Sequence, residues 1–377
     1  MALNFSIIVP TVNRPETLVH TLRTLVDLGG DDYEIVVTDD AGHPENRSVV
    51  ESFGRPDLIR YIRHETRQGM RGNYEFSVGV AQGQYVTILG DDDGMVANAL
   101  GYAREAIAAT RAEVLFWWPH MYWWPTALIE HKRWMLYIQR PTKNVRPVEA
   151  FSYVAELYKP GVNHWLFERL PSIYNGFVSR PLLQRLKERT GAYFLDEVPD
   201  VYSGIANGVF AQTAAFIEWP LSIRGISGKS FGVAFRNPQG KAISDEFKGG
   251  MKSPMCEPDL VDSTALAVHV ASIKLRAIRR LQGPLSSYTI NVQDVINGIL
   301  GEIQEGQGRK AELLEDARAL GQKYGIDISG LRAEDIPEQT PTKAWGWHQD
   351  LLAVNCEFVE VADIHASRAM LASIVGL

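Results

Sequence analysis

The sequence predicts an α/β protein whose mostly parallel central sheet is covered by helices on both faces, with a mainly helical C-terminal extension. Three observations predict this class. Strand-like runs alternate with helical patterns up to Trp118, which is the order of successive βαβ units. Runs such as Glu34–Thr38 (EIVVT) lack polar alternation, as expected of parallel strands buried on both faces. Beyond Pro258 the periodicity is helical.

The first βαβ unit is predicted by Phe5–Val9, a helix, and Glu34–Thr38. Pro15 suits the first turn of the helix, with Asn13 as its candidate N-cap. A leucine stripe gives this helix one buried face, and Gly29 suits its end. We expect a right-handed crossover between the two strands.

The same alternation continues along the chain. Further strands are predicted at Leu58–Arg63, Gln84–Leu89 and Glu113–Trp118, with helices at Gly72–Ala81 and Met95–Ala109. Later elements are short helices at Pro181–Arg189 and Val201–Phe210, an edge strand at Ile217–Ile223, and a long loop or boundary at Ser227–Pro258. The C-terminal helices are predicted from two apolar faces, one beginning at Leu266 and one at Leu313.

We therefore expect one domain over residues 1–235, followed by a linker and helical region over residues 236–377. Within the first domain, residues 1–115 hold the alternating strands and helices, and residues 116–235 are richer in Trp, Tyr, Pro and His.

Composition excludes several classes of protein. The 377 residues carry 38 Lys and Arg against 45 Asp and Glu, a net charge of −7, so the chain has no basic field for nucleic acid. Two cysteines cannot build a disulfide framework or a four-thiolate zinc site. The start MALNFSIIVP does not resemble a signal peptide, and Val114–Ile129 is too interrupted to span a bilayer. We expect the cytoplasm, with at most a peripheral contact at the inner face of a membrane.

Polar residues follow the ends of several predicted strands. They are Thr11, Asp39, Asp40 and the run Asp91, Asp92 and Asp93. Ligands of parallel sheets bind at the carboxyl ends of the strands, so these side chains predict a binding site. Three adjacent carboxylates need a compensating cation, and oxygen ligands suit Mg²⁺ or Mn²⁺. The alternative is a solvated turn, which uses the same residue types.

Four segments carry a family resemblance: SIIVPTVNRPETL, EIVVTDDAG, RQGMRGN and GQYVTILGDDDGM. Together they resemble the nucleotide-binding half of a family 2 glycosyltransferase with the GT-A fold. The resemblance covers residues 4–115 well and extends loosely to about residue 235. The resemblance implies that the first domain is catalytic, with a nucleotide-binding half over residues 1–115 and an acceptor half over residues 116–235. It also implies an inverting enzyme of the hexosyltransferase type that uses a nucleotide-diphosphate sugar, with a UDP-sugar preferred. The implied acceptor is a glycan, a lipid-linked or another hydroxyl compound, in surface polysaccharide or glycoconjugate biosynthesis.

The resemblance also implies roles for individual residues. The base and ribose are lined by Pro10, Thr11, Asn13 and Arg14, with Asp39 and Asp40 accepting from the base and Arg71 and Asn73 beside base and phosphates. Asp91, Asp92 and Asp93 match the DxD region, where one carboxylate meets the ribose and another meets Mn²⁺ or Mg²⁺. Gly90 stands where the family has its first Asp, which leaves open which aspartate does which task. Caps, turns and a surface arginine are the alternatives for single positions.

An inverting transfer needs a carboxylate that takes the proton of the acceptor hydroxyl. The resemblance places this base before a helix, and the segment TGAYFLDEVPDVYSGIANG offers Asp200, with Asp196 and Glu197 as rivals. The family's adjacent Glu-Asp pair is absent, because Pro199 precedes Asp200. The alternative is that Asp200 only caps the helix.

Other side chains are candidates for contact with sugar or diphosphate. The set is Trp117, Trp123, His164, Trp165, Tyr174, Asn175 and Gly176 for acceptor or donor sugar, and Arg224 and Lys229 for a loop over the diphosphate. Aromatic faces stack on sugars, although aromatic residues are also common in strand cores. The basic helix with Lys274, Arg276, Arg279 and Arg280 is either a solvated flank or a weak contact with an anionic membrane.

Two other functions compete with glycosyl transfer. A nucleotidyltransferase would begin with a glycine-rich basic loop after its first strand, and PTVNRPET has no such loop. A non-catalytic module that binds nucleotide-sugar or glycan would keep the aspartate cluster but could do without the base.

Overall fold

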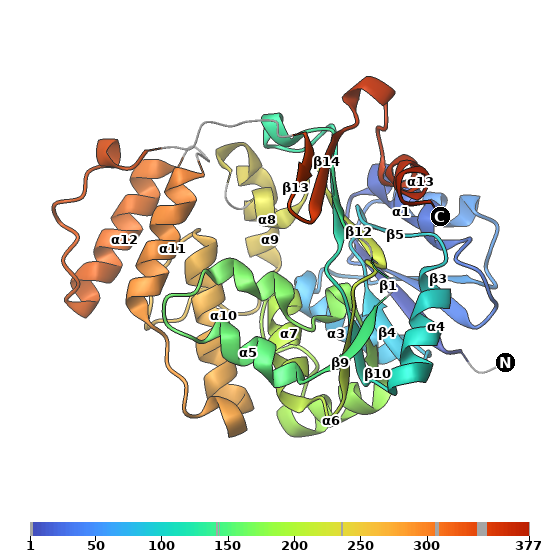
Figure 1. Ribbon diagram of the computed structural model, residues 1–377, viewed down its shortest axis with the longest axis horizontal. Helices are drawn as coiled ribbons and strands as arrows, with labels where there is room; N and C mark the ends of the chain where they lie inside the picture. The colour runs from blue at the N-terminus through green and yellow to red at the C-terminus, as the bar shows by residue number, and fades with distance from the viewer. Residues whose placement is uncertain are drawn as a thin grey trace.

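The computed structural model describes residues 3–140, 142, 144–234, 237–305, 309–337 and 345–376. Its strands form two sheets (Figure 1). The first has the order β3 (Ile59–Arg63), β2 (Tyr33–Asp39), β1 (Phe5–Thr11), β4 (Tyr85–Ile88), β10 (Gly176–Ser179), β6 (Val114–Phe116), β11 (Ala214–Ile217) and β9 (Val145–Val148). The second has the order β13 (Gly346–His348), β14 (Leu351–Asn355), β8 (Met135–Gln139), β7 (His120–Trp123), β12 (Ser222–Ile226) and β5 (Gly94–Met95).

The predicted α/β class is confirmed. Strands β3, β2, β1 and β4 are parallel, whereas β10 runs antiparallel to both of its neighbours, β4 and β6. Neighbouring residues of β1 enter different core clusters, since Ile7 packs with α1 (Pro15–Leu25) and Ile8 packs with α3 (Gly69–Val80). Both side chains are fully buried, which is why the run lacks polar alternation.

The helices divide between the two faces of this sheet. The face with α1 also holds α4 (Ala99–Thr110), and the opposite face holds α6 (Arg180–Thr190) and α7 (Pro199–Phe210) beside α3. The carboxyl ends of β1, β2 and β4 therefore open at one edge, between the two helix layers.

Several predicted boundaries are wrong. Asn13 does not cap α1, because its φ is +53° and its carboxamide accepts from the His43 amide instead. The segment Glu45–Ser52 forms helix α2, which the sequence did not predict, since its apolar face is only Val49 and Val50. The helix expected from Met95 begins at Ala99, after the short strand β5.

The edge strand expected at Ile217–Ile223 is also wrong, because the chain leaves the first sheet at Ile217 and enters the second at Ser222. Likewise, the long loop expected at Ser227–Pro258 contains helices α8 (Phe231–Ala234) and α9 (Lys241–Gly250).

The C-terminal helical region is confirmed. Helices α10 (Leu266–Leu281), α11 (Val292–Gln304) and α12 (Lys310–Tyr324) form a third core cluster, on the side away from α1 (Figure 1). Helix α10 also joins this cluster to the second core cluster, because its residues Ile273 and Ala277 pack with the residues of α7. No helix in the described ranges has both the length and the hydropathy to cross a membrane.

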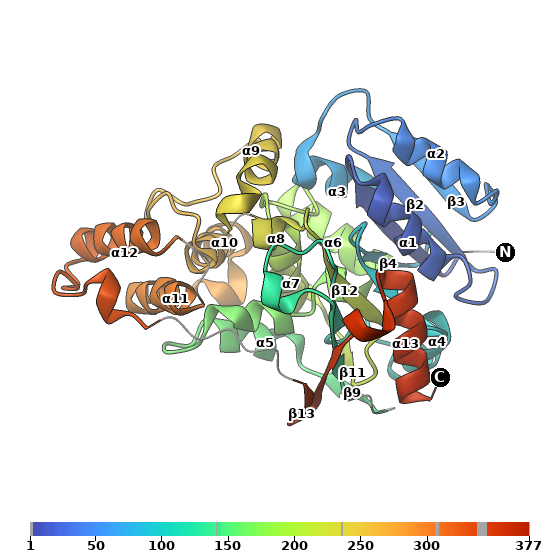
Figure 2. The same cartoon turned by 90° about the horizontal axis from the view of Figure 1, so that it is seen from above.

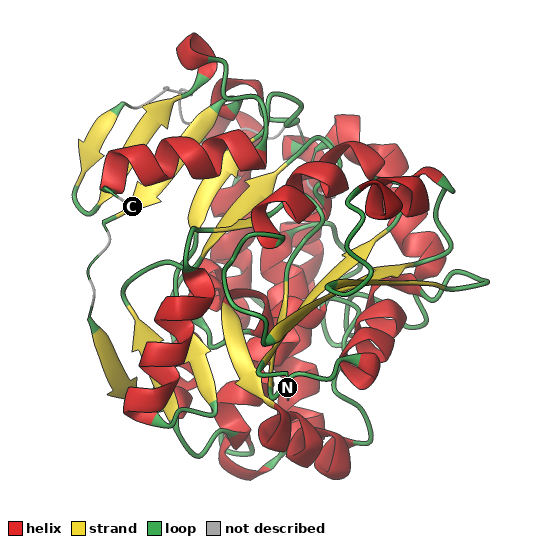
Figure 3. Ribbon diagram, turned by 90° about the vertical axis from the view of Figure 1, so that its right-hand side faces the viewer, coloured by secondary structure: helices red, strands yellow, loops and turns green. Residues whose placement is uncertain are grey.

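The segment after residue 345 returns to the first half of the chain. Strand β14 pairs with β8, and α13 (Ile364–Val375) lies against α1 (Figures 2 and 3). Arg368 of α13 donates to Asp27 Oδ1 at 2.6 Å, and His20 Nδ1 of α1 lies 3.2 Å from Asp363 Oδ2. The expected division at residue 235 stays a prediction, with this segment packed on elements that precede residue 140.

Candidate active site

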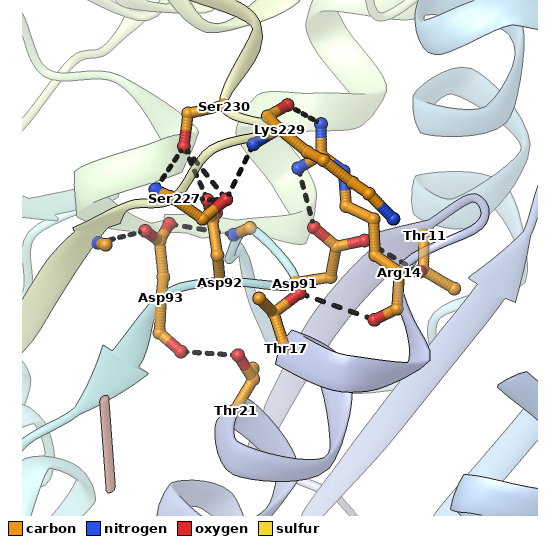
Figure 4. Close-up of polar contacts among 12 residues, drawn as sticks. Thr11, Arg14, Thr17, Thr21, Asp91, Asp92, Asp93, Ser227, Lys229 and Ser230 are labelled. Atoms are coloured by element: carbon orange, nitrogen blue, oxygen red, sulfur yellow. Dashed lines mark hydrogen bonds and ion pairs between the residues drawn. The ribbon is translucent and has the colours of Figure 1, made fainter. Parts of the chain in front are cut away.

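The aspartate run directly follows β4, at the open edge of the parallel strands. All three side chains are buried, with 4%, 4% and 1% exposure for Asp91, Asp92 and Asp93. Their carboxylates point in three directions, each toward a different group of donors (Figure 4). The solvated turn is therefore excluded, and each carboxylate has its own surroundings.

Asp91 faces the start of α1. Its Oδ2 accepts from Thr11 Oγ1 at 2.6 Å, and its Oδ1 accepts from Arg14 Nη1 at 3.0 Å. Burial raises the pKa of Asp91 to about 6, although the Arg14 charge opposes the rise. Three residues that the sequence assigned to nucleotide binding thus lie in one hydrogen-bonded group.

Asp92 faces the turn after β12. Its Oδ2 accepts from Ser227 Oγ at 2.6 Å, Ser230 Oγ at 2.5 Å and the Ser227 amide at 3.2 Å. Its backbone carbonyl accepts from Trp124 Nε1 at 3.0 Å. Among the described residues, no donor reaches its Oδ1, which leaves one carboxylate oxygen of the cluster open to a ligand.

Asp93 faces strand β12. Its Oδ1 accepts from the Gly225 amide at 2.6 Å, and its Oδ2 accepts from the Gly90 amide at 2.9 Å and interacts with the Tyr174 hydroxyl. Burial and the Asp92 charge raise the pKa of Asp93 to about 7. Position 225 must be glycine, because a Cβ there would lie 1.7 Å from the Asp92 carbonyl oxygen.

Hydrogen-bond donors and a guanidinium group stabilise the three adjacent carboxylates. Arg14 compensates Asp91, and backbone amides compensate Asp93. Within the described residues, no three His, Cys, Asp or Glu side chains are placed to hold a metal ion together. A metal site made of Asp91, Asp92 and Asp93 therefore stays a prediction. A divalent ion fits only if Asp92 Oδ1 is joined by oxygens from a ligand or from water.

The second strand ends in a different environment. Asp39 is fully buried and accepts from the Gly42 amide, Asn46 Nδ2 and Tyr61 Oη at 2.6, 3.1 and 2.6 Å. Asp40 accepts from the Gln68 and Gly69 amides at 2.6 and 3.0 Å and so closes the N-terminus of α3. Arg67 Nε lies 3.3 Å from Asp40 Oδ2. Both carboxylates support the loops around the site.

The remaining predicted nucleotide residues are placed as follows. Pro10 is the residue before Thr11 at the end of β1. Asn73 is buried and structural, because it donates to the Thr38 carbonyl at 3.0 Å and lies 3.1 Å from His64 Nε2. Arg71 points to Glu197, with 3.8 Å between Nε and Oε1. Asn13 lies at the site, and its Nδ2 donates to Glu246 Oε1 at 3.1 Å.

Asp200 lies at the first turn of α7, near the aspartate run. Burial raises the pKa of Asp200, and the Arg224 charge opposes the rise. Arg224 also interacts with the charges of Asp93 and Glu168, and its Nη1 donates to Glu168 Oε1 at 2.9 Å. The pKa of Tyr74 is raised first by burial and then by the negative charges of Asp200, Asp93 and Asp91. Arg224 and Tyr74 thus connect the candidate base to the cluster.

The two rival bases are occupied elsewhere. Asp196 Oδ2 accepts from Arg276 Nη1 at 2.5 Å, and its Oδ1 accepts from the Val198 amide at 3.0 Å. Glu197 Oε1 accepts from the Lys252 amide at 3.2 Å and Ser253 Oγ at 2.8 Å. Both carboxylates are 1% exposed, so the geometry favours Asp200 for contact with an acceptor.

The aromatic candidates separate into core and site. Trp117 is 1% exposed and donates to Ser222 Oγ at 2.8 Å, so its ring has no face free for a sugar. Trp123 is 6% exposed and packs under Lys132. Tyr174 is the member of the set that reaches the cluster, through Asp93.

The other acceptor candidates lie away from the aspartates. The rings of His164 and Trp165 lie 5.3 Å apart in a tilted arrangement, and His164 lines a cavity of about 30 Å³ between α5 (Ala150–Leu157), α10 and α11. Asn175 donates to the Trp117 carbonyl at 2.7 Å, and Gly176 begins β10. These side chains are structural in this arrangement.

Sequence reasoning missed several residues of the site. Ser227 and Ser230 stood in a segment expected to be loop, and no periodicity marks Tyr74 or Glu168 as polar partners. Arg67 and Glu246 are 179 residues apart and form a 2.9 Å ion pair. Only the tertiary fold could reveal such a pair.

The first part of the chain is similar to known glycosyltransferases. The model of glycosyl transferase family 2 matches residues 6–157. The GalNAc(5)-diNAcBac-PP-undecaprenol beta-1,3-glucosyltransferase of Campylobacter jejuni is 35% identical over 97 residues, which are 25% of this chain and 31% of that protein. Glycosyltransferase GlyG of Streptococcus pneumoniae is 23% identical over 111 residues, 29% of this chain and 37% of that one. The matched segment thus spans about a third of the length of these curated relatives.

Solved structures show a loose overall likeness. TarS 1-349 of S. aureus aligns with a TM-score of 0.47 and 18% identity, over 86% of this chain and 91% of that chain. Mannosyltransferase PcManGT from Pyrobaculum calidifontis, solved with GDP-Man and Mn²⁺, aligns with a TM-score of 0.47 and 16% identity, over 89% and 78%.

Proposed function

We propose that this chain is a glycosyltransferase that moves a sugar from a nucleotide-diphosphate donor to a hydroxyl acceptor, with inversion, and the match of residues 6–157 to the model of glycosyl transferase family 2 supports this proposal. The observation that carries the proposal is the buried group of Arg14 and Asp91–Asp93 at the carboxyl edge of the parallel strands, with Asp200 linked to it through the charge of Arg224. Two cationic side chains, Arg14 and Arg224, lie beside the carboxylates there. A donor that carries a diphosphate suits such a site, because guanidinium groups bind phosphate oxygens well.

The protein's own groups divide the work of the reaction. Asp200 takes the proton of the acceptor hydroxyl as its oxygen attacks the anomeric carbon. A carboxylate whose pKa is raised by burial is a stronger base than an exposed one, which suits this task. Arg14 and Arg224 stabilise the negative charge that develops on the leaving diphosphate. Tyr174 fixes the Asp93 side chain and closes the floor of the site.

Metal dependence is part of the proposal and concerns a single carboxylate. Asp92 Oδ1 is the oxygen that would hold Mn²⁺ or Mg²⁺, with diphosphate oxygens and water as the other ligands. When bound, the ion would neutralise diphosphate charge and so help the nucleoside diphosphate to leave. The difference between Mn²⁺ and Mg²⁺ is to be settled by activity measured with each ion alone.

A UDP-sugar is the proposed donor, and Asp40 is the better of the two candidate acceptors for uracil. A carboxylate offers about four lone-pair sites. Asp39 is fully buried and accepts hydrogen bonds from three neutral donors. Asp40 accepts from two backbone amides and forms an ion pair with Arg67. Each carboxylate thus has about one lone-pair site left. Asp40 is preferred because it is 3% exposed, whereas Asp39 is fully buried.

The decisive experiment is a screen of nucleotide sugars. The protein is incubated with UDP-, GDP-, dTDP- and CDP-sugars and a mixture of acceptors, and the free nucleoside diphosphate is measured. Release from a UDP-sugar that depends on both acceptor and Asp200 supports the proposal. Release from none of them, with intact folding, would favour a non-catalytic binding module. A nucleotidyltransferase would instead release pyrophosphate, and the family match argues against it.

The acceptor is proposed as a glycan or lipid-linked compound, in surface polysaccharide or glycoconjugate assembly in the cytoplasm. A peripheral membrane contact would bring the enzyme to a lipid-linked acceptor. Helix α10 is poorly suited to that contact, because Arg276 and Arg279 are paired with Asp196, Glu257 and Asp259. A better place is the turn region with exposed Trp345, Trp347 and Phe358, where the Arg140 guanidinium lies over the Trp347 ring.

Flotation with phosphatidylglycerol vesicles tests this contact. Trp347→Ser combined with Phe358→Ser should reduce vesicle binding, whereas Phe76→Ser, a distant partly exposed aromatic residue, should not. Equal binding of parent and double variant would exclude the surface.

A further inference from the structure

Two described segments, residues 227–234 and 237–253, lie over the aspartate cluster and the start of α3; we call them the cover. The first contains α8 and the second contains α9. They contact five residues around the site, which are Asn13 and Arg14 before α1, Glu16 in α1, Arg67 before α3, and Asp92. Each of these contacts uses hydrogen-bonding capacity that a donor substrate would also need.

The first segment bonds to the phosphate side of the site. Ser227 and Ser230 provide all three hydrogen bonds described for Asp92 Oδ2. The Lys229 ammonium donates to the Asn13 carbonyl at 2.8 Å and lies 2.6 Å from Glu16 Oε1. Arg14 donates to the Lys229 carbonyl, so its guanidinium is shared between Asp91 and the cover.

The second segment forms hydrogen bonds on the side of the site where we propose that the uracil base of the nucleotide lies. The Glu246 carboxylate of α9 accepts from Asn13 Nδ2 at 3.1 Å and from Arg67 Nη1 at 2.9 Å. Both of these partners of Glu246 precede residue 115 in the chain. Its side chain is 48% exposed, so the contact does not hold the core together.

Helix α9 comes unusually close to α3. A Cβ on Gly69 would lie 2.1 Å from the Gly250 carbonyl oxygen, and a Cβ on Gly250 would lie 3.2 Å from Gly69 Cα. Two glycines therefore let the end of α9 touch the N-terminus of α3, beside Asp40. The backbones leave no room for a ligand atom between them at this point.

We propose that the cover is an internal competitor of the donor, with the Glu246 carboxylate as its latch on Asn13 and Arg67. The inference rests on the proposed function, because it takes the groups beneath the cover as the nucleotide site. The donor can bind only when the latch opens, and its apparent affinity is reduced by the fraction of molecules that are closed. The device keeps the cluster shielded from water until a nucleotide-diphosphate sugar replaces the latch.

The test removes the latch charge without changing its size. Glu246→Gln should raise the affinity for UDP about three- to tenfold in calorimetry, because a partly exposed ion pair contributes a modest free energy. Asp245→Asn is the matched control, since Asp245 is the neighbouring carboxylate on α9 and pairs with Lys241 at 2.7 Å instead. The control should bind UDP like the parent.

A steric variant checks the same device independently. Gly250→Val places side-chain atoms against the Gly69 backbone and should push α9 away, again raising UDP affinity. Weaker binding in Glu246→Gln would mean that Glu246 contacts the donor itself, and unchanged binding in both variants would mean that the cover does not compete. Either result overturns the inference.

Hydrogen exchange separates this inference from the proposed function. In the absence of any nucleotide, the amides of residues 241–250 should exchange faster in Glu246→Gln than in the parent, while Asp245→Asn should match the parent. If the parent binds no nucleoside diphosphate, the proposed function fails, and exchange still reports whether the latch exists. Equal exchange in all three proteins would reject the latch.

Discussion

At the scale of single residues, the site combines groups that the sequence could mark with groups that only the fold reveals. Asp91–Asp93 were marked as a candidate site because adjacent carboxylates after a buried strand are costly, and Asp200 was marked by the family resemblance, so its role as base stays a prediction. The different surroundings of the three aspartates could not be predicted, because only the fold shows that Arg14 bonds to Asp91 and that the Gly90 and Gly225 amides bond to Asp93. A sequence shows the charges but not the donors that a distant strand brings beside them.

Asp200→Asn should keep nucleotide binding and lose transfer. Removal of a general base typically lowers the rate about 10²–10⁴-fold. Turnover and UDP affinity are to be measured on the same preparation, by product release and calorimetry. Asp196→Asn is the informative comparison, because it breaks the buried pair with Arg276 and should lower the melting temperature. If Asp200→Asn turns over like the parent, the base is another residue.

Asp92→Ala should weaken the part of UDP binding that depends on Mn²⁺ or Mg²⁺, since it removes the open carboxylate oxygen. Calorimetry with and without EDTA measures that part directly. Phe76→Ala is the control variant and should bind UDP like the parent, because Phe76 is a partly exposed residue outside the cluster. Equal UDP affinity of the parent in both conditions would rule out the metal role.

At the scale of elements, the first strands of the parallel sheet and most helices followed from the pattern of the sequence, whereas the order of the strands within the sheet did not. The parallel strands β1, β2 and β4 were predictable because each is a short apolar run between helical patterns. The strands of the second sheet were not, since β5 has two residues and β13 has three, and neither length gives a periodic signal. Helix α9 was hidden for another reason, because its glycines are typical of loops yet serve the approach to α3.

Arg368→Ala should lower the free energy of unfolding by about 1–2 kcal/mol. The Arg368 side chain is 9% exposed and donates to the buried Thr24 carbonyl at 3.1 Å as well as to Asp27, so its loss leaves a buried acceptor unpaired. Urea denaturation is the measurement. Arg23→Ala, on the exposed side of α1, is the matched control and should change the value by less than about 0.5 kcal/mol. Equal effects of the two substitutions would show that α13 does not depend on this contact.

At the scale of the whole molecule, stability is expected to depend on pH through a buried histidine. His120 in β7 is 2% exposed, and its Nδ1 accepts from the Gln139 amide at 3.1 Å. Burial lowers the pKa of His120 from 6.5 to about 3. The unfolded chain therefore binds a proton that the folded chain refuses, so folding loses stability as the pH falls from 6.5 toward 3.

The expected slope from this residue is about 1.4 kcal/mol per pH unit inside that window, and it is absent above pH 6.5. His120→Asn keeps an acceptor near the Gln139 amide but cannot titrate. Its free energy of unfolding should fall less steeply between pH 6.5 and 4.5 than that of the parent, as measured by urea denaturation at each pH. Parallel curves for the two proteins would contradict the assignment.

The contact between α1 and α13 joins Thr24 and Arg368, which are 344 positions apart. On the ribosome, α1 and strand β1 emerge early. Helix α13 packs in the same core cluster as Leu18, Leu22 and Leu25 of α1, and it is completed only when residue 375 has been synthesised. Until then, that surface of α1 meets water or a chaperone. Residues 1–115 are thus packed in two stages of synthesis. A fragment that ends before α13 would contain Asp91–Asp93 but would leave the apolar face of α1 exposed to water.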